Sequence, residues 1–309
     1  MSRILLACHG GPSSGGAVRV AKALSVRTGW AIDVVAALPP PAPTDYGYGP
    51  VFVPDAQTEE LLEERLLNDV QRQLARGGLG SLKPTLMVGA PAGAIAEAAL
   101  ASGASLIVVG LGPHHFADRA LGGETALQLA QVASTPILAV PGGATALPRR
   151  VVAAVDYSTT SLSAASIAAS MLREGDTIEL VHVAPEAGPE HAATHVDPAT
   201  RLAEIAGTLE RPAGVLTTTC VLEHDPARAL LDYLQGSHAE LVALGSHGYG
   251  VWKRLLMGSV ASKVLRMAQC AVLVVPAGCP MAAAKGLATA SSMGRMTDRL
   301  TTVQSWGER

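Results

Sequence analysis

Short apolar runs alternate with longer amphipathic stretches along most of this chain. Residues 3–8, 106–110 and 137–140 are apolar runs of this kind, whereas residues 59–76 have the periodicity of a charged amphipathic helix. Runs that are apolar at nearly every position are typical of strands buried on both faces of a parallel sheet, and the amphipathic stretches are typical of the helices that cover those faces. The pattern therefore predicts an α/β fold.

The pattern occurs twice, which indicates an internal repeat. From Pro91 in the first half and Pro226 in the second, the two halves align without a gap until after their last apolar run. A duplicated α/β unit explains this alignment better than two unrelated domains do. The runs that match are residues 3–9 with 150–156, 106–110 with 241–245, and 137–141 with 272–276.

We place the first unit at residues 1–143 and the second at 149–278, followed by a polar segment at 279–309 that we expect to be a mobile tail or a loosely docked helix. Each unit is predicted to be a doubly wound, five-stranded parallel sheet with strand order 3-2-1-4-5, in which ligands bind at the carboxyl ends of strands where the order reverses. In the second unit we expect strands at 150–155, 178–184, 215–221, 240–245 and 271–276, and helices at 159–173, 198–211, 226–236 and 259–268.

The most informative segment is a glycine-rich loop between two of these predicted elements. An apolar strand ends at Gly245, Gly248 follows, and a nine-residue spacer leads to Gly258 and Ser259, where a helix begins. Glycine allows a backbone to approach a phosphate closely, and a helix N-terminus offers unpaired N–H groups and a favourable dipole. The spacing Gly-x2-Gly-x9-Gly-Ser therefore predicts a phosphate-binding loop, with Ser259 as the helix cap.

This segment resembles the nucleotide loop of the universal stress protein family, in the branch that binds ATP. The resemblance covers about 275 residues, but only the second half has the full motif. It implies an adenine nucleotide alpha hydrolase-like fold, ATP as ligand and a role in stress regulation; accompanying Mg²⁺ and slow ATP hydrolysis are left open. The site residues that it implies are Ala154, Asp156, Val183, Leu244, Gly245, Gly248, Gly258, Ser259 and Val260.

The first half departs from this motif at the positions that carry chemistry. His9 stands where Asp156 stands, Pro113 replaces the second glycine of the loop, and Glu124 replaces the serine. Proline removes a backbone donor, and a carboxylate at that position repels phosphate. We therefore expect the first half to keep the fold without an ATP site, with a different small ligand left open.

Composition limits the class of protein further. The net charge is −3 over 309 residues and no basic stripe is present, so the sequence does not predict nucleic-acid binding. The four cysteines show no metal-binding spacing, the apolar N-terminus is too short for a signal peptide, and no apolar run is long enough to insert in a membrane. We expect a soluble, cytoplasmic protein with reduced thiols.

Two other kinds of site are weighed against the nucleotide loop. Ser13 lies in Gly-Pro-Ser-Ser-Gly, which matches the nucleophile elbow of esterases, but the repeat shows that this position is the ordinary loop after the first strand. His191 and His195 have the spacing of a metal-binding pair and supply only two ligands. We find no Walker lysine, so the protein is at most a slow ATPase. A scaffold in which ATP is only a structural ligand remains an alternative.

The last strands of the two units are both apolar and both at a sheet edge. Residues 137–140 and 272–275 would expose an unpaired apolar edge if each unit stood alone. In the resembling family, subunits pair along this strand. We therefore predict a pseudo-dimer within one chain; a further homodimer and an unknown regulatory protein partner are left open.

Overall fold

The computed structural model describes residues 2–40, 55–112, 123–184, 197–246, 257–277 and 279, with the side chains of residues 123 and 124 excepted. In this part of the chain the first half contains five strands, β1 (Arg3–Ala7), β2 (Ala31–Leu38), β3 (Pro84–Val88), β4 (Leu106–Leu111) and β5 (Ile137–Pro141). Its helices are α1 (Ser14–Thr28), α2 (Ala56–Arg76), α3 (Pro91–Ser102) and α4 (Gly123–Val132).

The second half repeats this order of elements. Its strands are β6 (Arg150–Ala154), β7 (Thr177–Val183), β8 (Leu216–Leu222), β9 (Leu241–Gly245) and β10 (Ala271–Val275). Its helices are α5 (Thr159–Ser170), α6 (Pro198–Thr208), α7 (Pro226–Gly236) and α8 (Ser259–Met267). The predicted elements of this half are confirmed, and their ends differ from the predicted ones by at most three residues.

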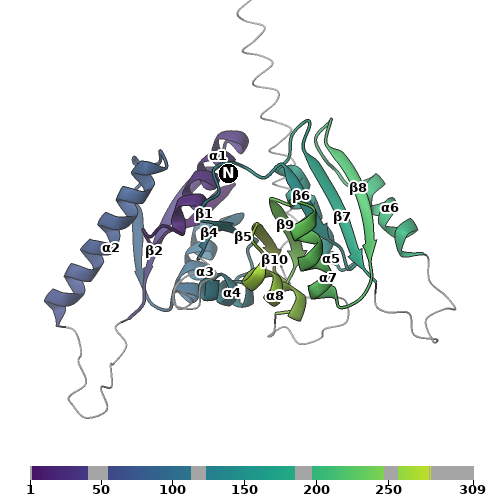
Figure 1. The fold of residues 1–309 in the computed structure, drawn as a ribbon. Helices are drawn as coiled ribbons and strands as arrows, with labels where there is room; N and C mark the ends of the chain where they lie inside the picture. Colours follow the sequence, from purple (N-terminus) through teal and green to yellow (C-terminus); the bar gives the residue numbers. More distant parts are fainter. Residues whose placement is uncertain are drawn as a thin grey trace, which may run out of the picture.

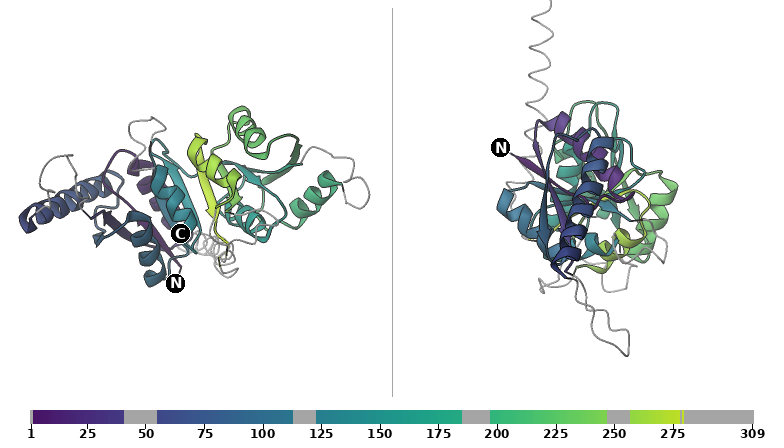
Figure 2. Two further views of the ribbon diagram at one scale, coloured as in Figure 1. Left: turned by 90° about the horizontal axis from the view of Figure 1, so that it is seen from below. Right: turned by 90° about the vertical axis from the view of Figure 1, so that its left-hand side faces the viewer.

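All ten strands form one sheet, in the order β3-β2-β1-β4-β5-β10-β9-β6-β7-β8. Each half has the predicted order 3-2-1-4-5, and the second half reads in the reverse direction across the sheet. Pairs within a half are parallel, whereas β5 and β10 pair antiparallel. Figure 1 shows these two strands in the middle of the molecule, and the left view of Figure 2 shows the same arrangement from below.

The junction between β5 and β10 confirms the predicted pseudo-dimer. Leu138 lies opposite Leu273, and Ile137 lies opposite Val274, in an antiparallel register. All four side chains are fully buried. The edge strand of each half is therefore covered by the other half, which removes the aggregation hazard of an exposed apolar edge.

Two layers of helices bury the two faces of this sheet. One apolar cluster joins α1, α2, α5 and α6 to the strands, and the other joins α3, α4, α7 and α8 to the opposite face. Most of the strand residues are Val, Leu, Ile and Ala, which fits strands that are buried on both sides. In each half the first two helices cover one face and the last two cover the other, so both faces are covered as in a doubly wound sheet.

The segment between the halves is fixed by one arginine of α1. The Arg19 side chain donates from Nη2 to the carbonyl oxygen of Gly142 at 2.7 Å and from Nε to that of Ala144 at 2.8 Å. A charged donor to two carbonyls that are two residues apart orders a glycine-containing segment that has no regular structure of its own. The short connection thus runs along the first half before it enters β6.

The four cysteines form no disulfide. Burial raises the pKa of the Cys8 thiol and raises the pKa of the Cys270 thiol to about 11. Both thiols are therefore protonated and unreactive at neutral pH. Among the described helices, none is both long and apolar enough to cross a bilayer.

The β5–β10 pairing predicts that the halves unfold together. Val274 is 0% exposed at this junction, so Val274→Lys should leave a buried, unpaired charge and lower the free energy of unfolding by about 3–5 kcal/mol. Trp30 is buried in the first half and reports on that half alone once Trp252 and Trp306 are replaced by Phe. In this background, Val274→Lys should lower the urea midpoint seen by Trp30 fluorescence.

The matched control places the same charge on an open strand. Val221 of edge strand β8 is 37% exposed, and Val221→Lys should change stability by less than about 0.5 kcal/mol. An unchanged Trp30 midpoint in the Val274→Lys protein would contradict the coupling of the two halves.

Candidate functional site

The carboxyl ends of β6 and β9 mark the point in the second half where the strand order reverses, and we call this position the Asp156 crevice. These strands are direct neighbours, with Val151 opposite Leu241 and Ala153 opposite Ala243. After β6 the chain passes into α5 on one face of the sheet, and after β9 it passes into α8 on the other face. Loops that leave adjacent strands toward opposite faces separate from each other, and this is where doubly wound sheets bind ligands.

Asp156 lies in a tight turn at the end of β6. Its backbone N–H donates to Ser161 Oγ at 3.3 Å, and its carboxylate Oδ1 accepts the Ser158 N–H at 3.0 Å. Between them, Tyr157 has a left-handed backbone with φ of 65°, which is unusual for an aromatic residue. The turn holds the Asp156 side chain in place, and Oδ2 has no protein partner among the described residues.

Gly245 is explained by packing at this crevice. A Cβ at this position would lie 2.4 Å from Thr160 Oγ1 and 3.0 Å from the backbone nitrogen of Ser161, in the first turn of α5. A Cβ at Gly110, its counterpart in the first half, would likewise lie 2.4 Å from the carbonyl oxygen of Ser13. The first glycine of the motif therefore serves the close approach of strand and helix in both halves, whether or not phosphate binds.

Ser246 ties together the two ends of the glycine-rich loop. Its N–H donates to the Val275 carbonyl at 2.9 Å, and its carbonyl accepts the Gly258 N–H at 2.8 Å. Its fully buried Oγ accepts the Ala277 N–H at 3.1 Å. Sequence reasoning missed this role, because a serine next to a glycine carries no signal that distinguishes a structural clamp from a solvated loop residue.

The start of α8 corrects one expectation. Gly258, with φ of −57° and ψ of 146°, is the N-cap, and the exposed Ser259 is the first residue of the helix, so the serine does not cap it. No side chain of the described residues accepts a hydrogen bond from this first turn. The other three helices of the second half are each capped by a side chain, from Ser158, Asp197 and Asp225.

An uncapped helix start beside the crevice is suited to an anion. The first-turn N–H groups of α8 have no side-chain acceptor, and the helix dipole favours negative charge there. Val260, the second residue of α8, is half-buried and contributes one of these N–H groups. Gly258, Ser259 and Val260 thus lie at this helix start, and the N–H groups of Ser259 and Val260 have no side-chain acceptor among the described residues.

The end of β7 forms one wall next to Asp156. Val183 is half-buried at the last position of this strand. The His182 ring lies 4.5 Å from the Tyr157 ring and donates from Nδ1 to the Val155 carbonyl at 2.7 Å. The Arg201 guanidinium lies 4.0 Å from the centre of the Tyr157 ring, which is a cation–π contact.

This stacked group of Tyr157, His182 and Arg201 was not anticipated from the sequence. A single histidine and a single tyrosine far apart in the chain give no pattern, and only the pairing of β6 with β7 brings them together. Ala154, the last residue of β6, is half-buried, whereas Leu244 is 3% exposed and packs in the core. Leu244 can therefore offer only its backbone to a ligand.

Several predicted site residues lie outside the described residues. These are Gly248 in the loop, Pro113 in the first half and the histidine pair of His191 and His195. The side chain of Glu124 is likewise not described. In the part of the chain that is described, no cluster of three His, Cys, Asp or Glu side chains could hold a metal ion.

The corresponding crevice of the first half contains a histidine–serine pair. His9 Nδ1 accepts the Gly11 N–H at 2.8 Å, so the proton of the neutral ring is on Nε2, which lies 2.8 Å from Ser13 Oγ. A general base that activates serine needs an unprotonated nitrogen at this position. No carboxylate of the described residues contacts His9, so the arrangement does not support an esterase.

The sequence and the fold are similar to those of known proteins. The sequence model of the universal stress protein family matches residues 1–141 and again 148–276. A universal stress protein of Mycolicibacterium smegmatis is 34% identical over 185 residues, which cover 56% of this chain and 62% of that protein. The match thus spans less than two thirds of that relative. A universal stress protein of Mycobacterium tuberculosis H37Rv is 30% identical over 224 residues, covering 68% of this chain and 74% of that protein.

The fold is also found among solved structures. A universal stress protein from Archaeoglobus fulgidus superposes with a TM-score of 0.62, covering 89% of this chain and 96% of that one. A second, described as a putative universal stress protein from Pseudomonas aeruginosa, gives 0.55 with coverage of 96% and 98%. Their sequence identities are 20% and 15%, so these matches support the fold alone.

The packing of Gly245 gives a prediction that does not depend on any ligand. Gly245→Ala should push the end of β9 away from α5 and lower the free energy of unfolding by about 1–3 kcal/mol. The matched control is Gly207→Ala in α6, where an added Cβ meets nothing within 4 Å. This change should be neutral or slightly stabilising because alanine favours helix. Equal urea midpoints for the two variants would show that Gly245 is not required for packing.

Proposed function

The chain belongs to the universal stress protein family, and we propose that it is a regulatory stress protein whose second half binds ATP. One observation carries the proposal. The uncapped N-terminus of α8 and the Asp156 turn lie at the carboxyl ends of adjacent strands. This is the position where the strand order of a doubly wound sheet reverses. One is a donor site for phosphate and the other is an acceptor site for hydroxyl groups, as a nucleoside triphosphate requires.

Each end of the nucleotide has a proposed partner. The Asp156 carboxylate accepts hydrogen bonds from the sugar through Oδ2, since Oδ1 already holds the turn. The backbone at Ala154 and Val183 and the neighbouring Tyr157–His182 wall receive the adenine. The phosphates bind the N–H groups of Gly248, Ser259 and Val260. The backbone at Leu244, Gly245 and Gly258 lies behind them, since the Gly258 N–H already donates to Ser246.

The described residues favour binding over turnover. The phosphate donors are backbone N–H groups, and these residues offer no carboxylate cluster to coordinate Mg²⁺. We therefore propose that any Mg²⁺ arrives with the nucleotide and that hydrolysis, if it occurs, is slow. The regulatory output is a nucleotide-dependent change in the surface around the start of α8, next to the Ser246–Gly258 hydrogen bond. A regulatory protein partner in the cytoplasm would recognise this change.

We also propose that the first unit ends at residue 143 and that the second begins at residue 149. The first unit has lost ATP binding. In the first crevice, the position of Asp156 is taken by His9, whose Nε2–H already points to Ser13. A ring that donates there cannot accept the sugar hydroxyls in the way that a carboxylate does. One nucleotide per chain is therefore expected.

Proline at the first position of α8 tests the role of the backbone donor. Proline is favoured at this helix position, and the ψ of 146° at Gly258 suits a residue before proline. Ser259→Pro therefore removes one N–H group while α8 stays intact. Because hydrogen bonds to charged groups are strong, ATP affinity measured by calorimetry should fall by about tenfold or more.

Ser259→Ala is the matched control, since it removes only the hydroxyl and keeps the N–H. It should lose less affinity than Ser259→Pro, and both proteins should keep the wild-type urea midpoint to within about 0.5 kcal/mol. Undiminished ATP affinity in a folded Ser259→Pro protein would refute the placement of the phosphates at α8.

A further inference from the structure

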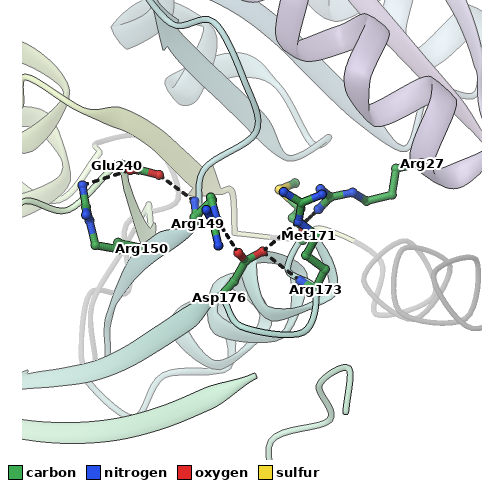
Figure 3. A network of polar contacts seen from close by, with 7 residues as sticks. All are labelled: Arg27, Arg149, Arg150, Met171, Arg173, Asp176 and Glu240. Atoms are coloured by element: carbon green, nitrogen blue, oxygen red, sulfur yellow. Dashed lines mark hydrogen bonds and ion pairs between the residues drawn. The ribbon is translucent and has the colours of Figure 1, made fainter. Parts of the chain in front are cut away.

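Three arginines from separate parts of the chain surround one buried aspartate between the two halves. Arg27 is in the last turn of α1, Arg149 immediately precedes β6, and Arg173 follows α5. They converge on Asp176, which immediately precedes β7 and is only 1% exposed (Figure 3). We call these four residues the Asp176 cluster. It lies at the amino ends of β6 and β7, whereas the Asp156 crevice lies at the carboxyl ends of β6 and β9.

Both oxygens of Asp176 are occupied within the cluster. Oδ1 accepts from Arg149 Nε at 2.9 Å, and Oδ2 accepts the Arg173 N–H at 3.0 Å. The Arg173 guanidinium lies farther away, with Nε 4.0 Å from Oδ2. Arg27 donates to the carbonyl oxygen of Met171, which carries no charge. The aspartate is thus satisfied, whereas no carboxylate of the described residues contacts Arg27.

The cluster has more positive than negative charge. Three guanidinium groups face one carboxylate, and the adjacent Arg150–Glu240 ion pair at 3.0 Å is balanced. Glu240 also accepts the Arg149 N–H, and the Glu174 side chain lies against Gly214. Burial lowers the pKa of Arg27, the like charge of Arg173 lowers it further, and Asp176 acts in the opposite direction.

We propose that the Asp176 cluster binds a multivalent oxyanion of the phosphate class, such as inorganic phosphate or pyrophosphate. Guanidinium groups present fixed pairs of donors that match phosphate oxygens, and several of them together hold such an anion without a metal. The Arg149 and Arg173 side chains are 58% and 64% exposed, so an anion can reach them from solvent. It neutralises the surplus charge of Arg27 and Arg173.

The location gives this anion a specific effect. Arg27 belongs to the first half and the other cluster residues belong to the second, so a bound anion bridges the two halves. It therefore stabilises the docked arrangement that β5 and β10 create. The site is chemically distinct from the nucleotide site, which offers backbone donors, and the inference does not depend on ATP binding.

The test is thermal unfolding of the full chain with pyrophosphate, compared with sodium chloride at equal ionic strength. At a concentration near ten times its dissociation constant, pyrophosphate should raise the melting temperature by about 3 °C. Arg27→Gln and Arg173→Gln should each lose most of this rise. The matched control is Arg228→Gln on α7, an exposed arginine in a surface ion pair, which should keep it. An equal rise in chloride, or a full rise in Arg27→Gln, would overturn the proposal.

Asp176→Asn should change the pyrophosphate-induced rise in melting temperature in the opposite direction from the arginine variants. A purely structural network would not give this difference. The Asp176→Asn protein should be less stable than the wild type in chloride, because three cations lose their counter-charge, yet it should show a larger pyrophosphate rise. A smaller rise in folded Asp176→Asn would overturn the proposal, and the arginine variants decide alone if this protein does not fold.

A parallel series with ATP identifies the source of the phosphate. Equal ATP-induced stabilisation of wild type and Arg27→Gln supports a free inorganic anion at the cluster. If Arg27→Gln loses the stabilisation by ATP, the anion that binds at the cluster is the phosphate group of a nucleotide.

Discussion

The antiparallel pairing of β5 with β10 is the interaction on which the rest of the structure depends. Each half ends in an apolar strand at the edge of its own sheet, and such an edge must be covered. Pairing the two edges buries both and forms one ten-stranded sheet from a tandem repeat. It also places the short connection, which Arg19 holds against the first half, where the chain enters β6.

The same pairing separates the sites. Because β5 and β10 run in opposite directions, the strands of the first half and those of the second half point their carboxyl ends in opposite directions. The two repeat-related crevices therefore cannot share one ligand, and each can diverge without affecting the other. The first half keeps the backbone geometry, in that the His9 and Asp156 N–H groups each donate to an equivalent serine at 3.3 Å. At this turn the two halves differ in the side chain, His9 in the first and Asp156 in the second.

The fold could be predicted from the sequence almost completely, because buried parallel strands are apolar throughout and the repeat supplies each pattern twice. The edge pairing was predictable for the same reason. The predicted site was less complete. Ser259 was expected to cap α8, but Gly258 takes that place, because Ser246 binds its N–H and fixes the chain entry. Ser246, the Tyr157–His182 contact and the Asp176 cluster depend on residues that are distant in sequence, which no local pattern can show.

Native mass spectrometry of the full chain in MgATP tests the central claim most directly. If the Asp156–α8 crevice binds ATP and the His9 crevice does not, the folded chain should gain the mass of one nucleotide and saturate there. Replacing Asp156 by Ala should weaken that single binding event. Saturation at two nucleotides per chain, or one nucleotide that Asp156→Ala leaves unaffected, would contradict the account.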